Sequence, residues 1–161
     1  MSAAAEPSTP VALVAMEAPA STGSNYPPPF AQRVAGRSRR RLGDLFGIEG
    51  FGVNLVTLAP GAQSSVRHRH SVQDEFVYLL SGELVLAHDG GETLLSAGMC
   101  AGFPHGGTAH HLINRSDAPA VYIEVGDRRP GDSADYPDDD LCAVAVPGGW
   151  RFTRKNGEPY A

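Results

Sequence analysis

Residues 61–82 read GAQSSVRHRHSVQDEFVYLLSG, and this stretch decides the fold. His68 and His70 are separated by one residue, and residues i and i+2 of a β-strand point to the same face, roughly 6.5 to 7 Å apart. Two imidazoles on one face can converge on one ion at about 2.0 to 2.2 Å. Glu75 opens the next apolar run, so an inward-facing Glu75 would place its carboxylate beside the two imidazoles.

A second stretch, residues 98–114, reads GMCAGFPHGGTAHHLIN. His110 begins a candidate strand there, in which His110, Leu112 and Asn114 share a face. All six histidines of the chain fall between residues 68 and 111, and this clustering is the main indication of chemistry: His68, His70, His88, His105, His110 and His111.

The surrounding chain consists of short apolar runs separated by turn residues, which is typical of an antiparallel sandwich or barrel. Asp89-Gly90-Gly91 is a hairpin signal between two of these runs. The 19 Gly and 13 Pro residues also favour turns and short strands over long helices. The sequence therefore predicts an all-β fold, built on the runs FGVNLVTLAPG, DEFVYLLSG, ELVLAHDGG, ETLLSAG and AVYIEVGD.

The chain has 161 residues, enough for one domain with its own core. Residues 1–25 are rich in Ala, Ser, Thr and Pro and are expected to form a flexible leader, or an edge strand at residues 11–16. The prolines of YPPPF (26–30) predict an extended lead-in to a single domain at 26–161. The tail from Cys142, with its aromatic residues, is expected to wrap back onto the barrel.

Composition excludes several classes of protein. A net charge of −5 gives no reason to expect a nucleic-acid partner. The one basic cluster, at residues 37–41 (RSRRR), could meet phosphate, but a solvated or salt-bridged strand face is the simpler interpretation. Two distant cysteines, Cys100 and Cys142, suggest neither a disulfide framework nor a zinc knuckle, which fits a reducing cytoplasm. No run approaches the ~18 apolar residues of a membrane span.

The two stretches resemble the two motifs of the cupin family. Residues 61–82 are similar to the first motif, a Gly, then His-x-His, Glu and Gly, with the spacing after Gly61 one residue longer than usual. Residues 98–114 are similar to the second motif, with a gap one residue longer between Gly106 and His110. The flanks GDLFG, EVGDRRPGD, YPDDDL and FTRKNGEPY are similar to small bacterial single-domain cupins, many of which carry labels such as sugar-phosphate isomerase-like.

This resemblance implies a double-stranded β-helix, the jelly-roll barrel, with an extended N-terminal lead-in and a C-terminal tail. It also implies one metal ion on four residues: His68, His70, Glu75 and His110. The longer gap leaves His111 as a rival to His110, although the spacing to Asn114 favours His110. Three imidazoles and a carboxylate suit a divalent Fe, Mn, Ni, Co, Cu or Zn ion, and the sequence does not choose among them.

A four-ligand site can leave coordination positions open for substrate, so a metal-dependent enzyme is the leading hypothesis. Its substrate would be a small polar molecule, such as a sugar derivative or organic acid, in an isomerase-like, lyase-like or O2-dependent dioxygenase reaction. The alternative is a non-catalytic protein that binds or senses a small ligand through its metal. His105 or His111 is the candidate acid-base residue, with His105 the first choice. The resemblance also implies a homodimer.

Overall fold

The computed structural model describes residues 9–160, and within that range the named strands pair antiparallel in three sheets. The largest sheet has five strands, each hydrogen-bonded to its neighbour along the sheet. Its order is β1 (Arg37–Arg41), β2 (Phe51–Leu58), β9 (Ala120–Asp127), β4 (Glu75–Ser81) and β7 (Cys100–Phe103).

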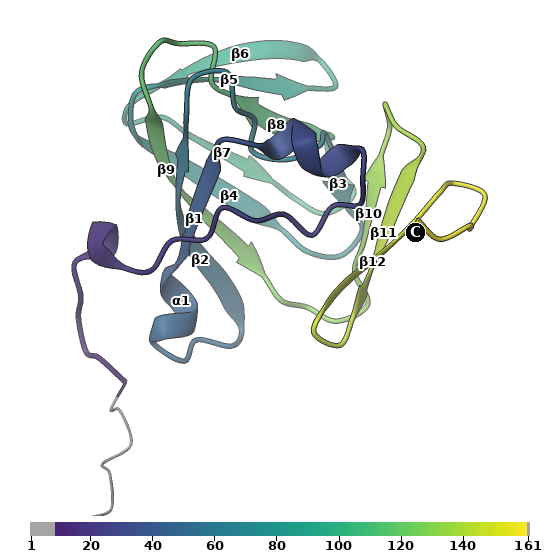
Figure 1. Cartoon of the computed structure of the whole chain (residues 1–161), viewed down its shortest axis with the longest axis horizontal. Helices are drawn as coiled ribbons and strands as arrows, with labels where there is room; N and C mark the ends of the chain where they lie inside the picture. Colours follow the sequence, from purple (N-terminus) through teal and green to yellow (C-terminus); the bar gives the residue numbers. More distant parts are fainter. Residues whose placement is uncertain (1–8, 161) are drawn as a thin grey trace, which may run out of the picture.

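Two smaller sheets complete the body of the molecule (Figure 1). One has the order β6 (Gly91–Ser96), β5 (Glu83–His88) and β8 (His110–Ile113). The other has the order β12 (Gly149–Thr153), β11 (Leu141–Val146), β10 (Ser133–Tyr136) and β3 (Arg69–His70). An isolated bridge between His68 and His110 connects β8 to the chain that enters β3.

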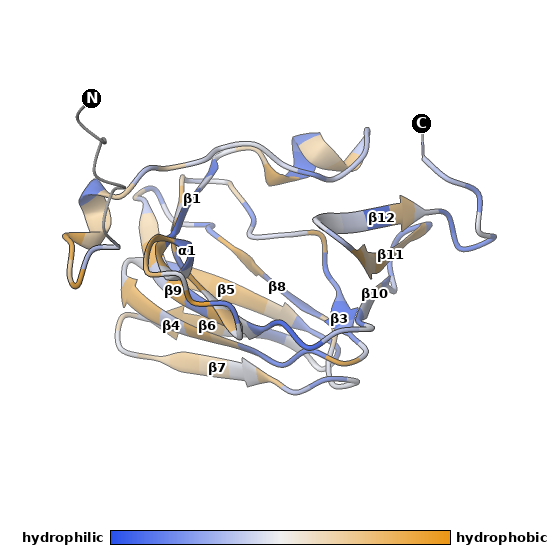
Figure 2. Ribbon diagram, turned by 90° about the horizontal axis from the view of Figure 1, so that it is seen from below, coloured by the Kyte–Doolittle hydropathy of each residue, from blue (hydrophilic) through white to orange (hydrophobic). Residues whose placement is uncertain are grey.

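The alternation of apolar residues explains how the sheets pack. On β2 and β9, Val56, Leu58 and Tyr122 are almost completely buried and belong to the core that lies between the five-stranded and three-stranded sheets. Figure 2 shows apolar colouring on β4, β5 and β9 of these two sheets. A second core holds β10 and β11 against Phe30 of the 3₁₀ helix η2 (Phe30–Val34).

The architecture confirms the predicted all-β jelly-roll fold. The predicted hairpin also forms, because His88 pairs with Gly91 across the turn between β5 and β6. The short α1 (Leu42–Leu45) follows β1 directly. No helix in the described range is long and apolar enough to cross a bilayer.

The N-terminal segment lies along the body of the domain. Residues 11–16 add no strand, and the 3₁₀ helix η1 (Ala15–Glu17) lies there instead. The contact with the sheet edge comes later, where Ser21 and Arg39 exchange two backbone hydrogen bonds of 2.9 Å. At the other end of the chain, Trp150 and Phe152 of β12 pack against the second core, as expected for a tail that folds back.

Candidate metal centre

Three imidazoles surround one carboxylate oxygen inside the barrel. The Nε2 atoms of His68 and His70 each lie 3.5 Å from Oε2 of Glu75. Nε2 of His110 lies 3.0 Å from the same oxygen. His68, His70 and Glu75 offer ligand atoms within 4.8 Å of one another, a group that could hold a metal ion. The side chains that the sequence predicted to converge therefore do so.

Backbone pairing positions these side chains. His68 and His110 lie opposite each other and exchange backbone hydrogen bonds of 2.8 and 3.1 Å. Glu75 begins β4 and pairs with Phe103 of β7. The ring of Phe103 stacks on that of His110, with centroids 3.4 Å apart and planes 3° from parallel. This stacking restricts the rotation of the His110 imidazole.

The outer nitrogen of each imidazole is held by an oxygen. Nδ1 of His68 lies 2.9 Å from the carbonyl oxygen of Val66, and Nδ1 of His110 lies 3.3 Å from that of Thr108. A carbonyl only accepts, so Nδ1 carries the proton and each Nε2 presents a lone pair to the interior. Nδ1 of His70 lies 2.5 Å from Oδ2 of Asp132 and is oriented in the same way.

This donor set fits a cation. Oε2 of Glu75 is buried and accepts no hydrogen bond of good geometry from the described residues. Inward lone pairs on nitrogen and oxygen repel each other unless a proton or metal ion lies between them. When no metal ion is bound, a proton on His70 can separate these lone pairs. Burial alone would lower the pKa of His70, but Glu75 and Asp132 raise it to about 9. Burial likewise opposes ionisation of Glu75, yet the three imidazoles hold its pKa well below its usual range.

Asp132 is the buried anchor of the site and was not predicted from the sequence. It is fully buried, and its Oδ1 accepts a hydrogen bond of 2.9 Å from the backbone N–H of Val72. Its Oδ2 orients His70 from the side opposite Glu75. Carboxylate partners of this kind fix the tautomer of a metal-binding histidine and raise its basicity.

The substitution Asp132→Asn is expected to weaken metal binding by about 10- to 100-fold. The asparagine amide keeps the shape of the side chain but cannot accept from both Val72 and His70, because one of its two ends is now a donor. Competition with a chromophoric chelator measures the affinity. The control is Asp135→Asn, which alters a nearby carboxylate on β10 that forms an ion pair with Arg69 at 3.3 Å. Equal affinity in both variants would contradict this role for Asp132.

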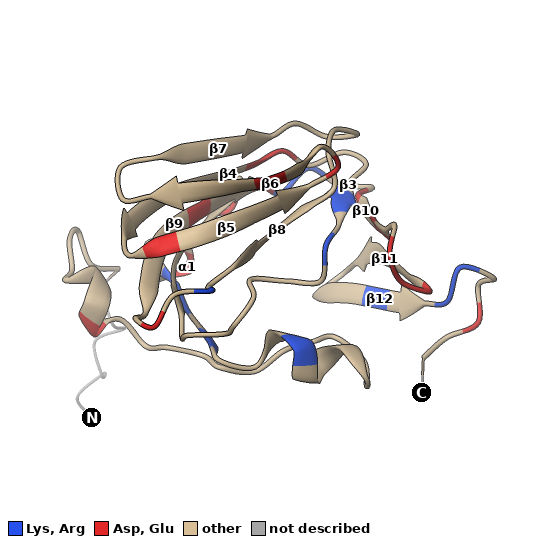
Figure 3. Cartoon of the chain, turned by 90° about the horizontal axis from the view of Figure 1, so that it is seen from above, with Lys and Arg blue, Asp and Glu red and all other residues tan. Residues whose placement is uncertain are grey.

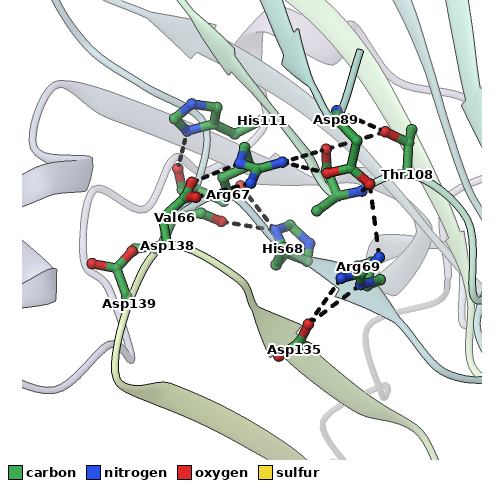
Figure 4. Close-up of polar contacts among 12 residues, drawn as sticks. Val66, Arg67, His68, Arg69, Asp89, Thr108, His111, Asp135, Asp138 and Asp139 are labelled. Carbon is green, nitrogen blue, oxygen red and sulfur yellow. Dashed lines mark hydrogen bonds and ion pairs between the residues drawn. The ribbon is translucent and has the colours of Figure 1, made fainter. Parts of the chain in front are cut away.

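Arg67 and Arg69, which alternate with the two histidines, face outward. Arg67 contacts Asp138 at 2.6 Å and Asp89 at 2.5 Å, and Arg69 contacts Asp135 (Figure 4). Figure 3 shows the basic colour of β3 beside acidic residues of β10 and the following turn. These ion pairs join the three-stranded and four-stranded sheets outside the barrel. They leave the inner face of this segment to the two imidazoles.

The remaining histidines lie outside this cluster. His111 follows His110 on β8, so its side chain lies on the opposite face of the strand, and its Nδ1 donates to the carbonyl oxygen of Ser65 at 2.9 Å. His105 is half exposed, with Nδ1 2.8 Å from Oδ1 of Asp74, and it does not line the cavity described below. His88 bonds to Thr93 and to the backbone of its own turn. An acid-base role for His105 stays a prediction.

The group of His68, His70, Glu75 and His110 opens into a cavity of about 1030 Å³. Its walls come from the inner face of the five-stranded sheet, from β12 and from residues of the N-terminal segment. Several polar residues that sequence reasoning did not single out line it: Tyr26, Asn54, Tyr122 and Glu124. Arginines of β1 also line it, although a solvated or salt-bridged strand face was the simpler interpretation of that basic cluster. The alternation of residues along 51–58 and 120–127 groups these side chains on one face of each strand. The sequence alone does not say which of the two faces is the inner one.

Comparison with known proteins places these features in context. The cupin domain family matches residues 54–126. A solved structure described as a sugar phosphate isomerase from a cupin superfamily, from Silicibacter pomeroyi, is 45% identical with a TM-score of 0.88. That alignment covers 93% of this chain and 96% of the other.

A protein provisionally called a sugar phosphate isomerase, from Acidithiobacillus ferrooxidans, is 29% identical with a TM-score of 0.70. The alignment covers 74% of this chain and 77% of the other. A polyketide cyclase from Streptomyces resistomycificus, 17% identical with a TM-score of 0.62, shares the fold over 75% of this chain and 82% of its own. No curated protein shows significant similarity to the chain.

Proposed function

The chain belongs to the cupin superfamily, and from that premise we propose that it is a metal-dependent enzyme that isomerises a small sugar derivative. The observation that carries the proposal is the set of three Nε2 atoms and one carboxylate oxygen at the wall of a large polar cavity. The relative from Silicibacter pomeroyi, described as a sugar phosphate isomerase, and that from Acidithiobacillus ferrooxidans, provisionally called one, support the reaction class.

His68, His70, Glu75 and His110 would hold one divalent transition metal ion. Such an ion, when bound, supplies a Lewis acid that polarises a substrate carbonyl or hydroxyl oxygen. The protein then needs a group that moves a proton between neighbouring carbon or oxygen atoms. The inward-facing carboxylate beside the site, Glu124, is our candidate for that group.

Glu124 is close to the metal ligands by strand register. Glu75 of β4 pairs with Gly126 of β9, so Glu124 is its diagonal neighbour on the same face. Diagonal neighbours in a sheet have Cα atoms roughly 7 to 8 Å apart. One oxygen of Glu124 accepts a hydrogen bond of 2.9 Å from Asn54. A substrate bound at the metal would therefore lie within reach of this carboxylate.

We expect Glu124→Gln to lower kcat by about 10²- to 10⁴-fold while metal content stays unchanged, because the amide cannot take up a proton. His105→Ala is the matched comparison, since His105 was the acid-base residue predicted from the sequence. Steady-state kinetics on both variants decide between them. A large loss in His105→Ala with normal activity in Glu124→Gln would reverse the assignment.

The proposal is tested by metal analysis joined to turnover. Protein prepared without a His tag is analysed by elemental mass spectrometry, then assayed on sugars, sugar phosphates and keto acids with and without O2. Near-stoichiometric metal is expected, with an isomerase activity that chelation removes and metal restores. Protein that stays metal-free after reconstitution would overturn the proposal. Consumption of O2 would indicate a dioxygenase, and saturable binding without turnover a ligand-binding protein.

We also propose that the chain forms a homodimer through the outer face of the five-stranded sheet. Phe51, Phe76 and Tyr78 are each at least 40% exposed on that face, which is unusual for large apolar side chains in contact with water. Phe76→Lys is expected to shift the mass measured by light scattering from that of a dimer to that of a monomer. A wild-type protein that is monomeric at micromolar concentration would contradict the proposal.

A further inference from the structure

The basic strand β1 presents part of its charge to the cavity. Alternation along the strand sends the side chains of Arg37, Arg39 and Arg41 to the cavity wall, whereas Arg40 does not line it. Arg39 pairs with Val56 of β2, which in turn pairs with Tyr122 of β9. A row of inward-facing residues therefore runs from β1 across β2 to β9, which neighbours β4 and its predicted metal ligand Glu75.

Arg37 is a buried cation for which the described residues supply no anionic partner. Its exposed fraction is 8%, and its Nη1 donates to the backbone carbonyl oxygen of Ser64 at 2.5 Å. Within residues 9–160, no carboxylate lies close enough to form an ion pair with it. Burial lowers the pKa of Arg37, and the like charge of Arg39 lowers it further. A buried charge is costly unless an opposite charge accompanies it, so this arginine favours an anion in the cavity.

Two neighbours of Arg37 have unused donors. Nε of Arg39 lies 3.1 Å from Oε1 of Glu124, but the pair lacks hydrogen-bond geometry, and the same oxygen already accepts from Asn54. Tyr122 is 1% exposed, and its hydroxyl has no partner among the described residues. Buried polar groups without partners are rare in folded proteins and call for an explanation. A bound oxyanion would satisfy the Arg39 guanidinium and the Tyr122 hydroxyl together.

We propose that Arg37, Arg39 and the Tyr122 hydroxyl bind the phosphate group of a phosphorylated sugar whose other end reaches the metal centre. This inference rests on the proposed function and adds its substrate class. Guanidinium forks match the geometry of phosphate oxygens, and a doubly charged group offsets two arginines better than one carboxylate does. Strands β1 and β4 have two strands between them and lie roughly 14 Å apart along the sheet. The long side chains of Arg37 and Arg39 span part of that distance. The remaining gap suits a small sugar phosphate.

The test is calorimetric binding of inorganic phosphate to metal-loaded and EDTA-treated protein. Arg39→Gln is expected to weaken phosphate binding by about 10- to 100-fold, and Tyr122→Phe by a smaller factor. Arg40→Gln removes the same charge from the other face of β1 and is expected to leave binding within about twofold. Tyr122→Phe removes only a hydroxyl that has no partner in residues 9–160, so thermal unfolding should show no loss of stability.

Two results would overturn the inference. One is an absence of saturable phosphate binding by the wild-type protein. The other is binding that disappears with EDTA and is unaffected by Arg39→Gln, which would place phosphate on the metal. Failure of the proposed function looks different: metal content and turnover would be absent while phosphate binding still depended on Arg39. Equal weakening by Arg40→Gln and Arg39→Gln would indicate only general charge attraction and would also overturn the assignment.

Discussion

The substitution His110→Ala is expected to lower metal affinity more strongly than Asp132→Asn, for which the expected loss is about 10- to 100-fold. Nε2 of His110 is the imidazole nitrogen nearest to the Glu75 carboxylate, at 3.0 Å, and its ring is held by the stacked ring of Phe103. Removal would leave two imidazoles and one carboxylate. Metal content after dialysis, measured by elemental mass spectrometry, would show the loss directly.

His111→Ala supplies the matched control. The two histidines are adjacent in sequence, yet His111 donates to the carbonyl oxygen of Ser65 on the opposite side of β8. We therefore expect His111→Ala to retain its metal. Retention of metal by His110→Ala and its loss from His111→Ala would show that the longer gap in the second motif shifts the ligand by one residue.

Gly82→Ala should destabilise the fold by about 3 kcal/mol, or roughly 10 °C in Tm. Gly82 has a φ of +82°, which disfavours any side chain. A Cβ there would also lie 2.9 Å from both Cα of Ala120 and the carbonyl oxygen of Pro119. Both are backbone atoms, and Ala120 begins the central strand β9, so neither can move without disturbing the core. Thermal unfolding by circular dichroism measures the change.

Gly98→Ala separates strain from crowding. Its φ of +91° is similar, but a Cβ at this position would meet nothing within 4 Å. Only the cost of placing a side chain on a left-handed backbone conformation remains, so the free energy of unfolding is expected to fall by about 1 to 2 kcal/mol. If both substitutions cost the same, the close approach of Gly82 to β9 would contribute nothing to stability.

The convergence of His68, His70 and Glu75 could be predicted because these residues are close in sequence, whereas His110 comes from a strand much further along the chain. His68 and His70 share a strand face by spacing alone, and Glu75 follows at once on the next strand. Turn signals such as Asp89-Gly90 are equally local and fixed the β5–β6 hairpin. His105 lies within the second motif, but sequence proximity to His110 did not indicate that its side chain turns outward to Asp74.

The rest depended on contacts that no local pattern contains. Asp132 is 62 residues from His70 and follows a loop rich in Gly, Pro and Asp. Nothing in such a loop distinguishes one aspartate as the partner of a histidine. The arginines of β1 looked like a solvated strand face because the pairing of β1 with β2 decides which side is inner. A shift of one residue in that register would have sent Arg40, in place of Arg39, into the cavity.

The predicted metal ligands and part of the cavity wall lie in different stretches of the chain, which has an evolutionary consequence. The stretch that matches the family, residues 54–126, contains every predicted metal ligand. Arg37, Arg39 and Tyr26 of the cavity wall lie before that stretch, and Trp150 lies after it. Under the proposed function, mutation or recombination at the two ends of the gene would change part of the substrate-binding wall and leave the predicted metal ligands in place. Related chains with identical motifs would then need not share a substrate, and their flanks should be compared together with the positions of Tyr122 and Glu124.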